Sequence, residues 1–173
     1  AESIINQKIT INEKCEWSSP ESIVEEIMNI SSAVTNQEKA MAIHGFIAKN
    51  RYHWQPSGDN IYDPIKYLNV YGYGFCGQTA YITDALSKVA GLKSRYWSLG
   101  GHLIFEVFYK GDWHVLDGQT MAFYLERDNK TIASMKEIIE DPWLVERTHH
   151  PVADMWRESH PRRARDVSET KYS

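Results

Sequence analysis

The sequence predicts an α+β fold in which N-terminal helices pack on an antiparallel sheet. Apolar residues recur at helical spacing up to Ala90, and from Arg95 onward they alternate with the two-residue period of a strand. Between two alternating segments, Lys110 and Gly111 are typical of a tight hairpin turn. Because the helices precede the strands instead of alternating with them, this architecture is favoured over a doubly wound parallel sheet.

Three helices are expected in the first half of the chain. The first begins with Ser19 as its N-cap and Pro20 in its first turn, and the second begins at Thr35 and reaches about residue 50. The third covers residues 77–90 and ends at Gly91. Their apolar stripes are Ile23, Ile27 and Ile30; Ala40, Ile43 and Ile47; and Ala80, Ile82, Ala85, Leu86 and Val89.

Residues 52–74 show no regular period and are predicted to form a long loop. Pro and Gly interrupt this segment repeatedly, with aromatic residues between them. Of the 21 aromatic residues in the chain, 16 lie between Tyr52 and Tyr124, so this part must form a core, a cleft or both. A long loop of this kind is more often functional than not, and it leads directly to Cys76.

The register of the central hairpin decides which of its side chains share a face. With Lys110 and Gly111 as a two-residue loop, counting back puts Asp117 opposite Ile104 and makes His102 its diagonal neighbour on the same face. A three-residue loop would put the histidine and the aspartate on opposite faces. The strands are expected at residues 95–99, 102–109, 113–117 and 121–125, followed by a helix at residues 134–140 that Ser134 caps.

The chain divides into an N-terminal strand and helix segment (residues 1–35), a core (36–146) and a polar C-terminal arm or linker (147–173). Ile9 and Ile11 fit a short strand in the first part. The chain begins without Met and without a signal-peptide pattern, so either a leader has been removed or this is part of a larger chain. Localisation stays open, export included. No apolar run approaches the length of about 18 residues that a membrane span needs, so we expect a soluble protein without a membrane partner.

Composition excludes several functional classes. Two cysteines cannot build a disulfide framework or a Cys-rich zinc module. A formal net charge of −4 argues against a nucleic-acid partner. The spacing of His149, His150 and His160 matches no metal-ligand set, and no calcium loop is visible. We therefore expect neither a metal nor a cofactor.

Cys76 stands where the aromatic loop becomes the third helix. The positive end of a helix dipole favours thiolate over thiol at such a position, and Gly74 and Gly77 let a substrate backbone approach closely. A buried cysteine that acts as a small apolar residue is the alternative interpretation. His102 and Asp117 argue against it, because a carboxylate can hold an imidazole in one tautomer while the imidazole takes the thiol proton.

The chain resembles the transglutaminase-like superfamily, which has a papain-like Cys-His-Asp core. The resemblance rests on a cysteine at a helix start, a Gly-His strand 26 residues later and the run Gly-Asp-Trp-His-Val-Leu-Asp that ends at Asp117. It spans residues 36–125, about half of the chain. The resemblance implies that Cys76 is the nucleophile, that His102 is the general base and then the general acid, and that Asp117 orients His102.

The resemblance also implies an oxyanion site and a cleft. The Cys76 backbone N–H is one candidate donor, and the family's upstream Trp or Gln indicates Trp54 or Gln55 as the other. Gln78 is expected to face solvent or to cap the third helix. The candidate walls of a substrate cleft are Tyr71, Tyr73 and Phe75.

Two positions depart from the family pattern. Gly118 follows Asp117 where many members have Pro, and Ile104 stands where many have an aromatic residue. Neither change removes a reacting group. The resemblance thus implies a cysteine-dependent amide hydrolase or acyltransferase that forms a thioester on Cys76, with hydrolysis favoured and a peptide, protein or other amide-bearing molecule as substrate. Two alternatives are a non-catalytic module that binds a peptide or glycan in an aromatic cleft, and arylamine N-acetyltransferase chemistry with coenzyme A.

Overall fold

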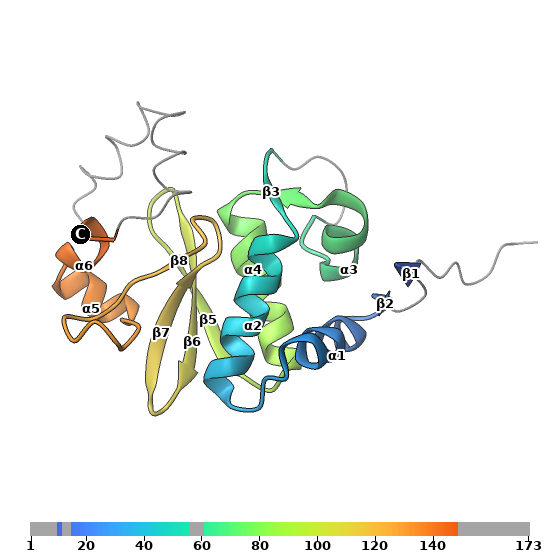
Figure 1. Ribbon diagram of the computed structural model, residues 1–173. Coiled ribbons are helices and arrows are strands. Elements are labelled where there is room, and N and C mark those ends of the chain that lie inside the picture. Colours follow the sequence, from blue (N-terminus) through green and yellow to red (C-terminus); the bar gives the residue numbers. More distant parts are fainter. Residues whose placement is uncertain (1–9, 12–14, 56–60, 149–173) are drawn as a thin grey trace, which may run out of the picture.

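The computed structural model describes residues 10–11, 15–55 and 61–148 (Figure 1). Within these ranges the chain has the expected α+β architecture, with a four-stranded sheet between two groups of helices. The helical segments are α1 (Pro20–Ser31), α2 (Asn36–Lys49), α3 (Pro64–Lys66), the π-helical turn η1 (Tyr67–Tyr71), α4 (Cys76–Val89), α5 (Met135–Glu140) and α6 (Trp143–Glu146). The strands are β1 (Thr10–Ile11), β2 (Cys15–Glu16), β3 (Tyr52–His53), β4 (Tyr73–Gly74), β5 (Lys93–Ser98), β6 (Leu103–Tyr109), β7 (Asp112–Asp117) and β8 (Ala122–Phe123).

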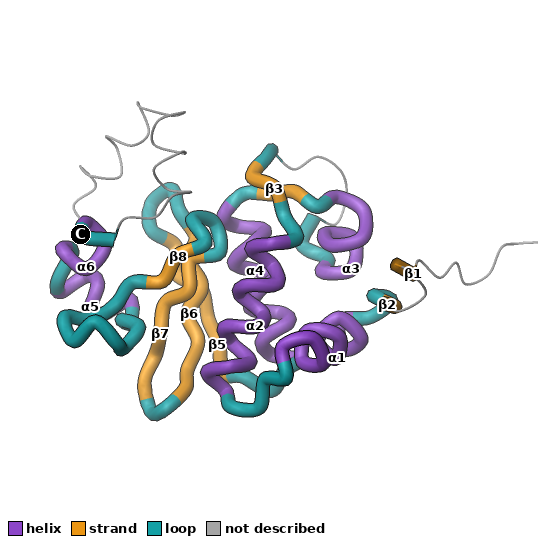
Figure 2. The backbone as a smooth tube through the Cα atoms, viewed as in Figure 1, coloured by secondary structure: helices purple, strands orange, loops and turns teal. Residues whose placement is uncertain are grey.

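The main sheet is antiparallel, with the strand order β5-β6-β7-β8 (Figure 2). Its central hairpin has the two-residue turn that the sequence predicts, since Tyr109 pairs with Asp112. Lys110 and Gly111 both have positive φ, at 52° and 91°, as a type I′ turn requires. The predicted register is therefore confirmed. The outer strand β8 is shorter than expected.

Hydrogen-bonded caps fix the starts of the predicted helices. Ser19 and Ser22 form a reciprocal capping box at α1, and Thr35 and Glu38 form one at α2. The cap at Ser134 starts α5 as predicted. The described helices are all too short or too polar to cross a bilayer.

One hydrophobic core lies between the sheet and the helices α1, α2 and α4. It includes side chains of α1, so this helix packs into the same core as the elements after residue 35; the domain boundary placed there stays a prediction. The predicted apolar stripes supply half of the buried members of this core, whereas Ile30 and Val89 are exposed. Members with no exposed surface are Ile23, Ile43, Ile47, Tyr67, Ile82, Leu86, Val107 and Leu116.

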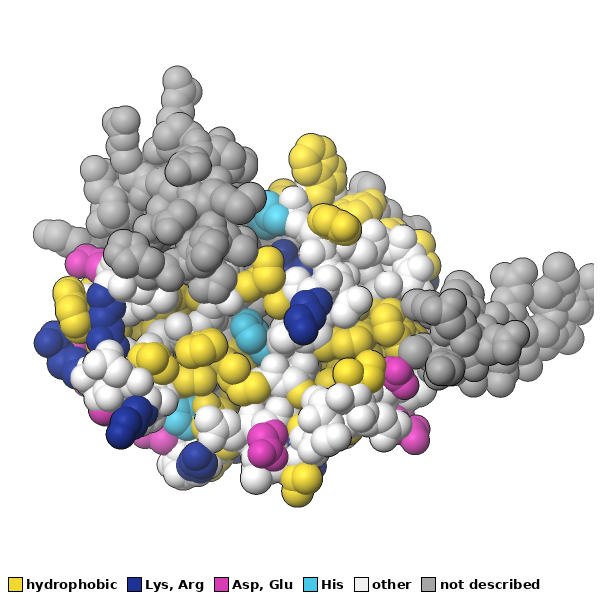
Figure 3. Space-filling view, viewed as in Figure 1, with side chains coloured by type: hydrophobic (Ala, Val, Ile, Leu, Met, Phe, Trp, Pro, Cys, Tyr) yellow, Lys and Arg dark blue, Asp and Glu magenta, His cyan; other side chains and the backbone are white. Residues whose placement is uncertain are grey.

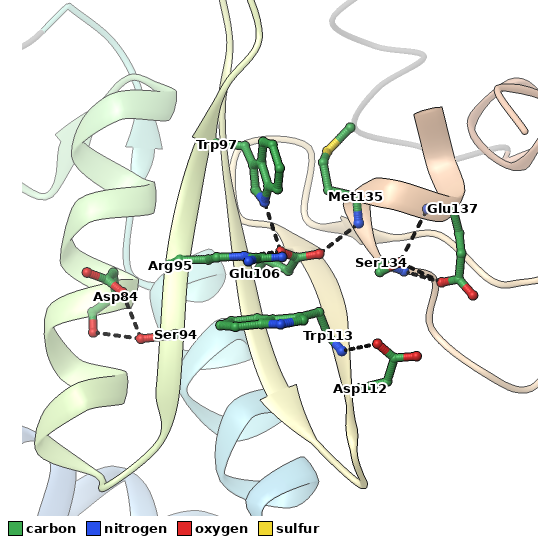
Figure 4. Close-up of polar contacts among 10 residues, drawn as sticks. All are labelled: Asp84, Ser94, Arg95, Trp97, Glu106, Asp112, Trp113, Ser134, Met135 and Glu137. Atoms are coloured by element: carbon green, nitrogen blue, oxygen red, sulfur yellow. Dashed lines mark hydrogen bonds and ion pairs between the residues drawn. The ribbon is translucent and has the colours of Figure 1, made fainter. Parts of the chain in front are cut away.

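The opposite face of the sheet packs against α5 and α6. Glu106 is completely buried there and accepts hydrogen bonds from Arg95, Trp97 and the Met135 backbone N–H (Figure 4). Arg95 also lies over the Trp113 ring, with its guanidinium carbon 3.8 Å from the ring centroid. The sheet thus separates an apolar core on the α4 side from a core on the other side that contains the buried carboxylate of Glu106.

The prediction of a long loop at residues 52–74 is wrong in part. β3 and β4 pair in parallel, Asp63 caps α3, and Tyr67 in η1 is fully buried. Elements of two to five residues are too short to show a period, which is why the sequence pattern missed them. The helix α6 was missed for the same reason.

Hydrophobic side chains reach the surface around β3 (Figure 3). Tyr52 and Trp54 are 81% and 70% exposed there. Several predictions lie outside the described residues, namely the strand position of Ile9, the C-terminal arm from residue 149 onward, and its histidines. Ile11 lies in β1 and Cys15 in β2, but nothing is described of the Cys15 side chain.

Candidate active site

The N-terminus of α4 places Cys76 at the first position of a 14-residue helix. The backbone N–H of Phe75 donates to the Gln78 side-chain oxygen over 3.0 Å, so Gln78 caps this helix, as predicted, and is buried rather than facing solvent. Gly74 lets the chain pass close to Tyr67 as it enters α4, because a Cβ at Gly74 would lie only 2.9 Å from the Tyr67 ring. Cys76 is half-buried.

His102 lies directly before β6 and contacts Asp117 at the end of β7. The His102 Nε2 atom is 2.9 Å from the Asp117 Oδ2 atom, and the Asp117 side chain is only 2% exposed. The contact that the hairpin register predicts therefore exists. A one-residue longer turn would have separated the two side chains.

The Asp117 carboxylate is held by groups that the sequence analysis did not single out. Its Oδ1 atom accepts the backbone N–H groups of Gln119 and Thr120, at 2.9 and 3.3 Å. Its Oδ2 atom accepts the Tyr124 hydroxyl at 3.4 Å. An aspartate that bonds backbone two residues on forms an Asx turn, which would have been the sequence signal. These bonds orient one carboxylate oxygen toward His102.

Cys76 and His102 influence each other's titration: His102 lowers the pKa of the thiol, and Cys76 raises the pKa of the imidazole. Hydrogen bonding from the backbone N–H groups of Leu103 and Gly77 lowers the pKa of the thiol as well. Burial raises the pKa of the Cys76 thiol, but these bonds and the charge of His102 outweigh it, so that the pKa is lowered overall.

The contact between His102 and Asp117 shifts the pKa values of both side chains. Burial lowers the pKa of His102, but the Asp117 charge and hydrogen bond, together with Cys76, raise it to about 10. Burial raises the pKa of Asp117, whereas the charge and hydrogen bond of His102 and the bonds from Thr120 bring it to about 2. The arrangement therefore favours a thiolate beside an imidazolium beside a carboxylate.

Arg51 supports this site from the segment between α2 and β3. It is 7% exposed, and its guanidinium donates to the carbonyl oxygens of Gly118 and Gln119. Burial lowers the Arg51 pKa, and the nearby charges of Tyr67, Asp117 and Cys76 oppose that effect. No local pattern in the sequence distinguishes Arg51, because its partners lie 67 and 68 residues away.

Gly118, where the chain departs from the family pattern, lies tightly against α4. A Cβ at Gly118 would come within 2.5 Å of the Thr79 methyl carbon. The absence of a side chain thus lets the end of β7 approach the helix that carries Cys76.

Of the predicted oxyanion and cleft residues, Phe75 directly precedes Cys76 as the N-cap residue of α4. Trp54 and Gln55 are exposed, and a donor role for either stays a prediction. Tyr71 and Tyr73 pack on each other with ring centroids 6.1 Å apart, and the Phe75 ring lies 5.0 Å from that of His53. Their part in a cleft also stays a prediction.

A cavity of about 330 Å³ lies beside Gly77 and Leu103, the residues that directly follow Cys76 and His102 in the chain. Its walls come from the segment before α3, from α4, from β5 and from the start of β6. The lining residues are Tyr62, Gly77, Tyr81, Tyr96 and Leu103. The tyrosines of this wall were not singled out from the sequence, because they are far apart along the chain. In the described part of the chain, no three His, Cys, Asp or Glu side chains gather as a metal site would require.

Comparison with known proteins finds no matching family model and no similar curated protein. Two solved structures are similar over part of their length. One is a candidate cysteine protease from Cytophaga hutchinsonii, with a TM-score of 0.48 and 18% identity, where the match covers 61% of this chain and 39% of that one. The other is a TGase, with a TM-score of 0.45 and 16% identity, where the match covers 69% of this chain and 34% of that one. The chain thus matches well under half the length of either protein.

Proposed function

We propose that the protein is a cysteine-dependent amide hydrolase or acyltransferase that forms a thioester on Cys76. The observation that carries this proposal is the 2.9 Å contact of His102 with the buried carboxylate of Asp117, and the effect of His102 on the pKa of the Cys76 thiol supports it. A nucleophile in contact with a base that a third group orients is the arrangement that activates a thiol.

Each residue has a distinct task in the proposed reaction. The Cys76 thiolate attacks the carbonyl carbon of an amide, and His102 gives its proton to the departing amine as the C–N bond breaks. The thioester then reacts with water or a second amine, whose proton His102 accepts, and the acyl group leaves the sulfur. Asp117 keeps its charge throughout and stabilises the imidazolium.

The start of α4 supports both the thiolate and the tetrahedral intermediate. Its first-turn N–H groups have no partners within the helix, and they carry the positive end of the helix dipole. The N–H groups of Gly77 and Leu103 lower the pKa of the Cys76 thiol. The Cys76 N–H is the donor we assign to the oxyanion, and removal of one such donor typically costs about 3–4 kcal/mol of transition-state stabilisation.

Alkylation with iodoacetamide tests the proposal, with mass spectrometry to follow Cys76 and Cys15 separately. We expect Cys76 to react much faster than Cys15 at pH 6–7, where an ordinary thiol with a pKa of about 8.5 is mostly protonated. The variant His102→Gln should lose this advantage, whereas His44→Gln, on α2, is the matched control. Slow and equal labelling of both cysteines would instead favour the non-catalytic binding module.

A second measurement separates hydrolysis from transfer. Acyl-aminomethylcoumarin amides report release of the amine, and added primary amine diverts the thioester if transfer occurs. We expect the free acid as the main product. If the amide of the added amine predominates, the protein is a transferase, and if no amine is released by wild type above the Cys76→Ser variant, an amidase activity on these substrates is excluded.

A further inference from the structure

Three tyrosines form an uninterrupted wall beside the proposed nucleophile. The ring centroids of Tyr62 and Tyr81 are 5.3 Å apart, and those of Tyr81 and Tyr96 are 6.3 Å apart. The three residues are 44–48% exposed, so a large part of their aromatic surface faces the cavity and solvent. An aromatic surface left exposed in one place indicates a binding surface more often than chance.

Two residues that line the cavity adjoin the proposed catalytic residues in the chain. Gly77 directly follows Cys76, and Leu103 directly follows His102. Tyr81 lies one helical turn after Gly77 on α4, and Tyr96 lies on β5, which pairs with β6. A molecule that fills the cavity therefore lies next to the residue that carries the reacting thiol.

The residues that line the cavity indicate which kind of molecule it can bind. The lining has no charged side chain, and its polar side-chain atoms are the three tyrosine hydroxyls. A charged side chain would find no counter-ion there, and a sugar would find few of the hydrogen-bonding groups that it needs. Aromatic rings instead gain from edge and offset contacts with other rings at centroid distances of about 4.5–7 Å.

We propose that this cavity binds an aromatic side chain of the substrate, carried by the residue whose carbonyl Cys76 attacks. The inference rests on the proposed function, because it assigns the cavity to the acyl half of an amide. That half stays bonded to the sulfur from attack to release of the thioester, so a cavity that begins at Gly77, the residue after Cys76, acts on it in both steps. The protein then prefers amides of phenylalanine, tyrosine or tryptophan over those of alanine, glutamate or lysine.

Chloromethyl ketones of single N-acetylated amino acids test this assignment. The thiolate displaces chloride and forms a thioether, so the labelling rate reports how the side chain next to the ketone is bound. We expect the phenylalanine probe to label Cys76 at least about tenfold faster than the alanine probe, as apolar pockets discriminate elsewhere. Iodoacetamide, which carries no such side chain, measures the reactivity of the thiolate by itself.

Variants identify the cavity as the source of the preference. Tyr81→Ala and Tyr96→Ala should each reduce the phenylalanine preference to within about threefold, as expected when aromatic contacts are lost. Tyr52→Ala removes an exposed tyrosine outside the cavity and should leave the preference unchanged. Iodoacetamide rates should stay the same in all three variants. Two cavity variants are used because, if one of them folds poorly, the other still shows whether the cavity causes the preference.

Each outcome bears on a different claim. Equal rates with the phenylalanine and alanine probes, together with rapid iodoacetamide labelling, overturn the cavity assignment and leave the proposed function intact. A preference that survives both tyrosine variants, or a faster reaction with the glutamate or lysine probe, also overturns the assignment. Slow iodoacetamide labelling of Cys76 overturns the proposed function and this inference together.

Discussion

Arg51 donates two hydrogen bonds to the carbonyl oxygen of Gly118, the residue that directly follows Asp117. A third bond reaches the carbonyl oxygen of Gln119 over 2.6 Å. The backbone N–H of Gln119 in turn donates to the Asp117 carboxylate. One buried guanidinium thus fixes the turn that holds the carboxylate in place, and through it the position of His102.

Replacement of Arg51 by methionine is therefore expected to affect both stability and the site. The variant leaves buried carbonyl oxygens without donors, which costs about 1–3 kcal/mol of unfolding free energy for each unsatisfied group. Urea denaturation measures that loss. Lys49→Met, two residues earlier and exposed, is the control and should change the free energy of unfolding by less than about 1 kcal/mol.

The labelling rate of Cys76 in the same two variants distinguishes a positioning role of Arg51 from a purely structural one. If Arg51 positions Asp117, the iodoacetamide rate of Cys76 near neutral pH falls in Arg51→Met at temperatures where the variant is fully folded. The Lys49→Met rate stays at the wild-type value. A folded Arg51→Met protein with wild-type labelling kinetics would limit Arg51 to a structural role.

The His102–Asp117 pair makes stability depend on pH with a predictable sign. The raised pKa of His102, about 10 against 6.5, adds stability that is fully present below pH 6.5 and is lost as pH rises toward 10. The lowered pKa of Asp117, about 2 against 3.8, adds stability that is present above pH 3.8 and is lost as pH falls toward 2.

Asp117→Asn removes this pair while it keeps the shape of the side chain. The difference in unfolding free energy between wild type and variant should be largest between pH 3.8 and 6.5 and should shrink on either side. Urea titrations at a series of pH values measure it. A difference that is constant from pH 3 to 10 would show that the two side chains are not coupled as charges.

The contact between His102 and Asp117 could be predicted from the sequence because a local feature determines it. Two turn residues, Lys110 and Gly111, set the hairpin register, and the register decides which side chains share a face. Arg51 could not be found in this way. Its role depends on a contact across 67 residues, and a single arginine after a helix carries no periodic signal.

The same difference between local and long-range determinants explains which features of the segment before Cys76 the sequence did not reveal. Tyr67 is fully buried in a π-helical turn of five residues, where no helical or strand period can develop. Aromatic composition alone therefore identified an important region but not which of its rings face the core. Tyr62, Tyr81 and Tyr96 meet in one wall because β5 folds back against α4, and this packing is not encoded in any local segment.

Glu106 is expected to contribute to stability without affecting the reactivity of Cys76. It accepts from Arg95 over 2.6 Å, from Trp97 over 2.8 Å and from the Met135 N–H over 2.8 Å. Glu106→Gln replaces one accepting oxygen with a donor and removes the charge, and bonds to a charged group contribute about 1.5–3 kcal/mol each. Urea denaturation should show a loss of this order.

Arg95→Met is the matched comparison for Glu106→Gln. It removes one donor at a half-exposed position and leaves the carboxylate its other two bonds, so the loss of stability should be smaller. Figure 4 shows this cluster on the side of the sheet away from α4. Iodoacetamide labelling of Cys76 should therefore be unchanged in both variants, and a large change would mean that the two faces of the sheet are coupled.

Gly118→Ala tests the close approach of β7 to α4. The new methyl group would lie 2.5 Å from the Thr79 methyl carbon, so the strand end must move away from the helix. Overpacking of this kind typically costs about 1–3 kcal/mol of unfolding free energy. Because Gly118 adjoins Asp117 and Thr79 lies three residues after Cys76, we also expect slower labelling of Cys76. Gly45→Ala, where a Cβ meets nothing within 4 Å, is the control and should be neutral or stabilising.

A second substitution separates this steric cause from a general intolerance at Gly118. Thr79→Ser removes the clashing methyl carbon and keeps the hydroxyl that donates to the Phe75 carbonyl over 3.0 Å. The double variant should regain most of the stability and Cys76 reactivity that Gly118→Ala loses, which a double-mutant cycle measures as a favourable coupling energy. Additive effects of the two substitutions would mean that a contact other than the Thr79 methyl limits the approach of β7, because residues that clash directly cannot change independently.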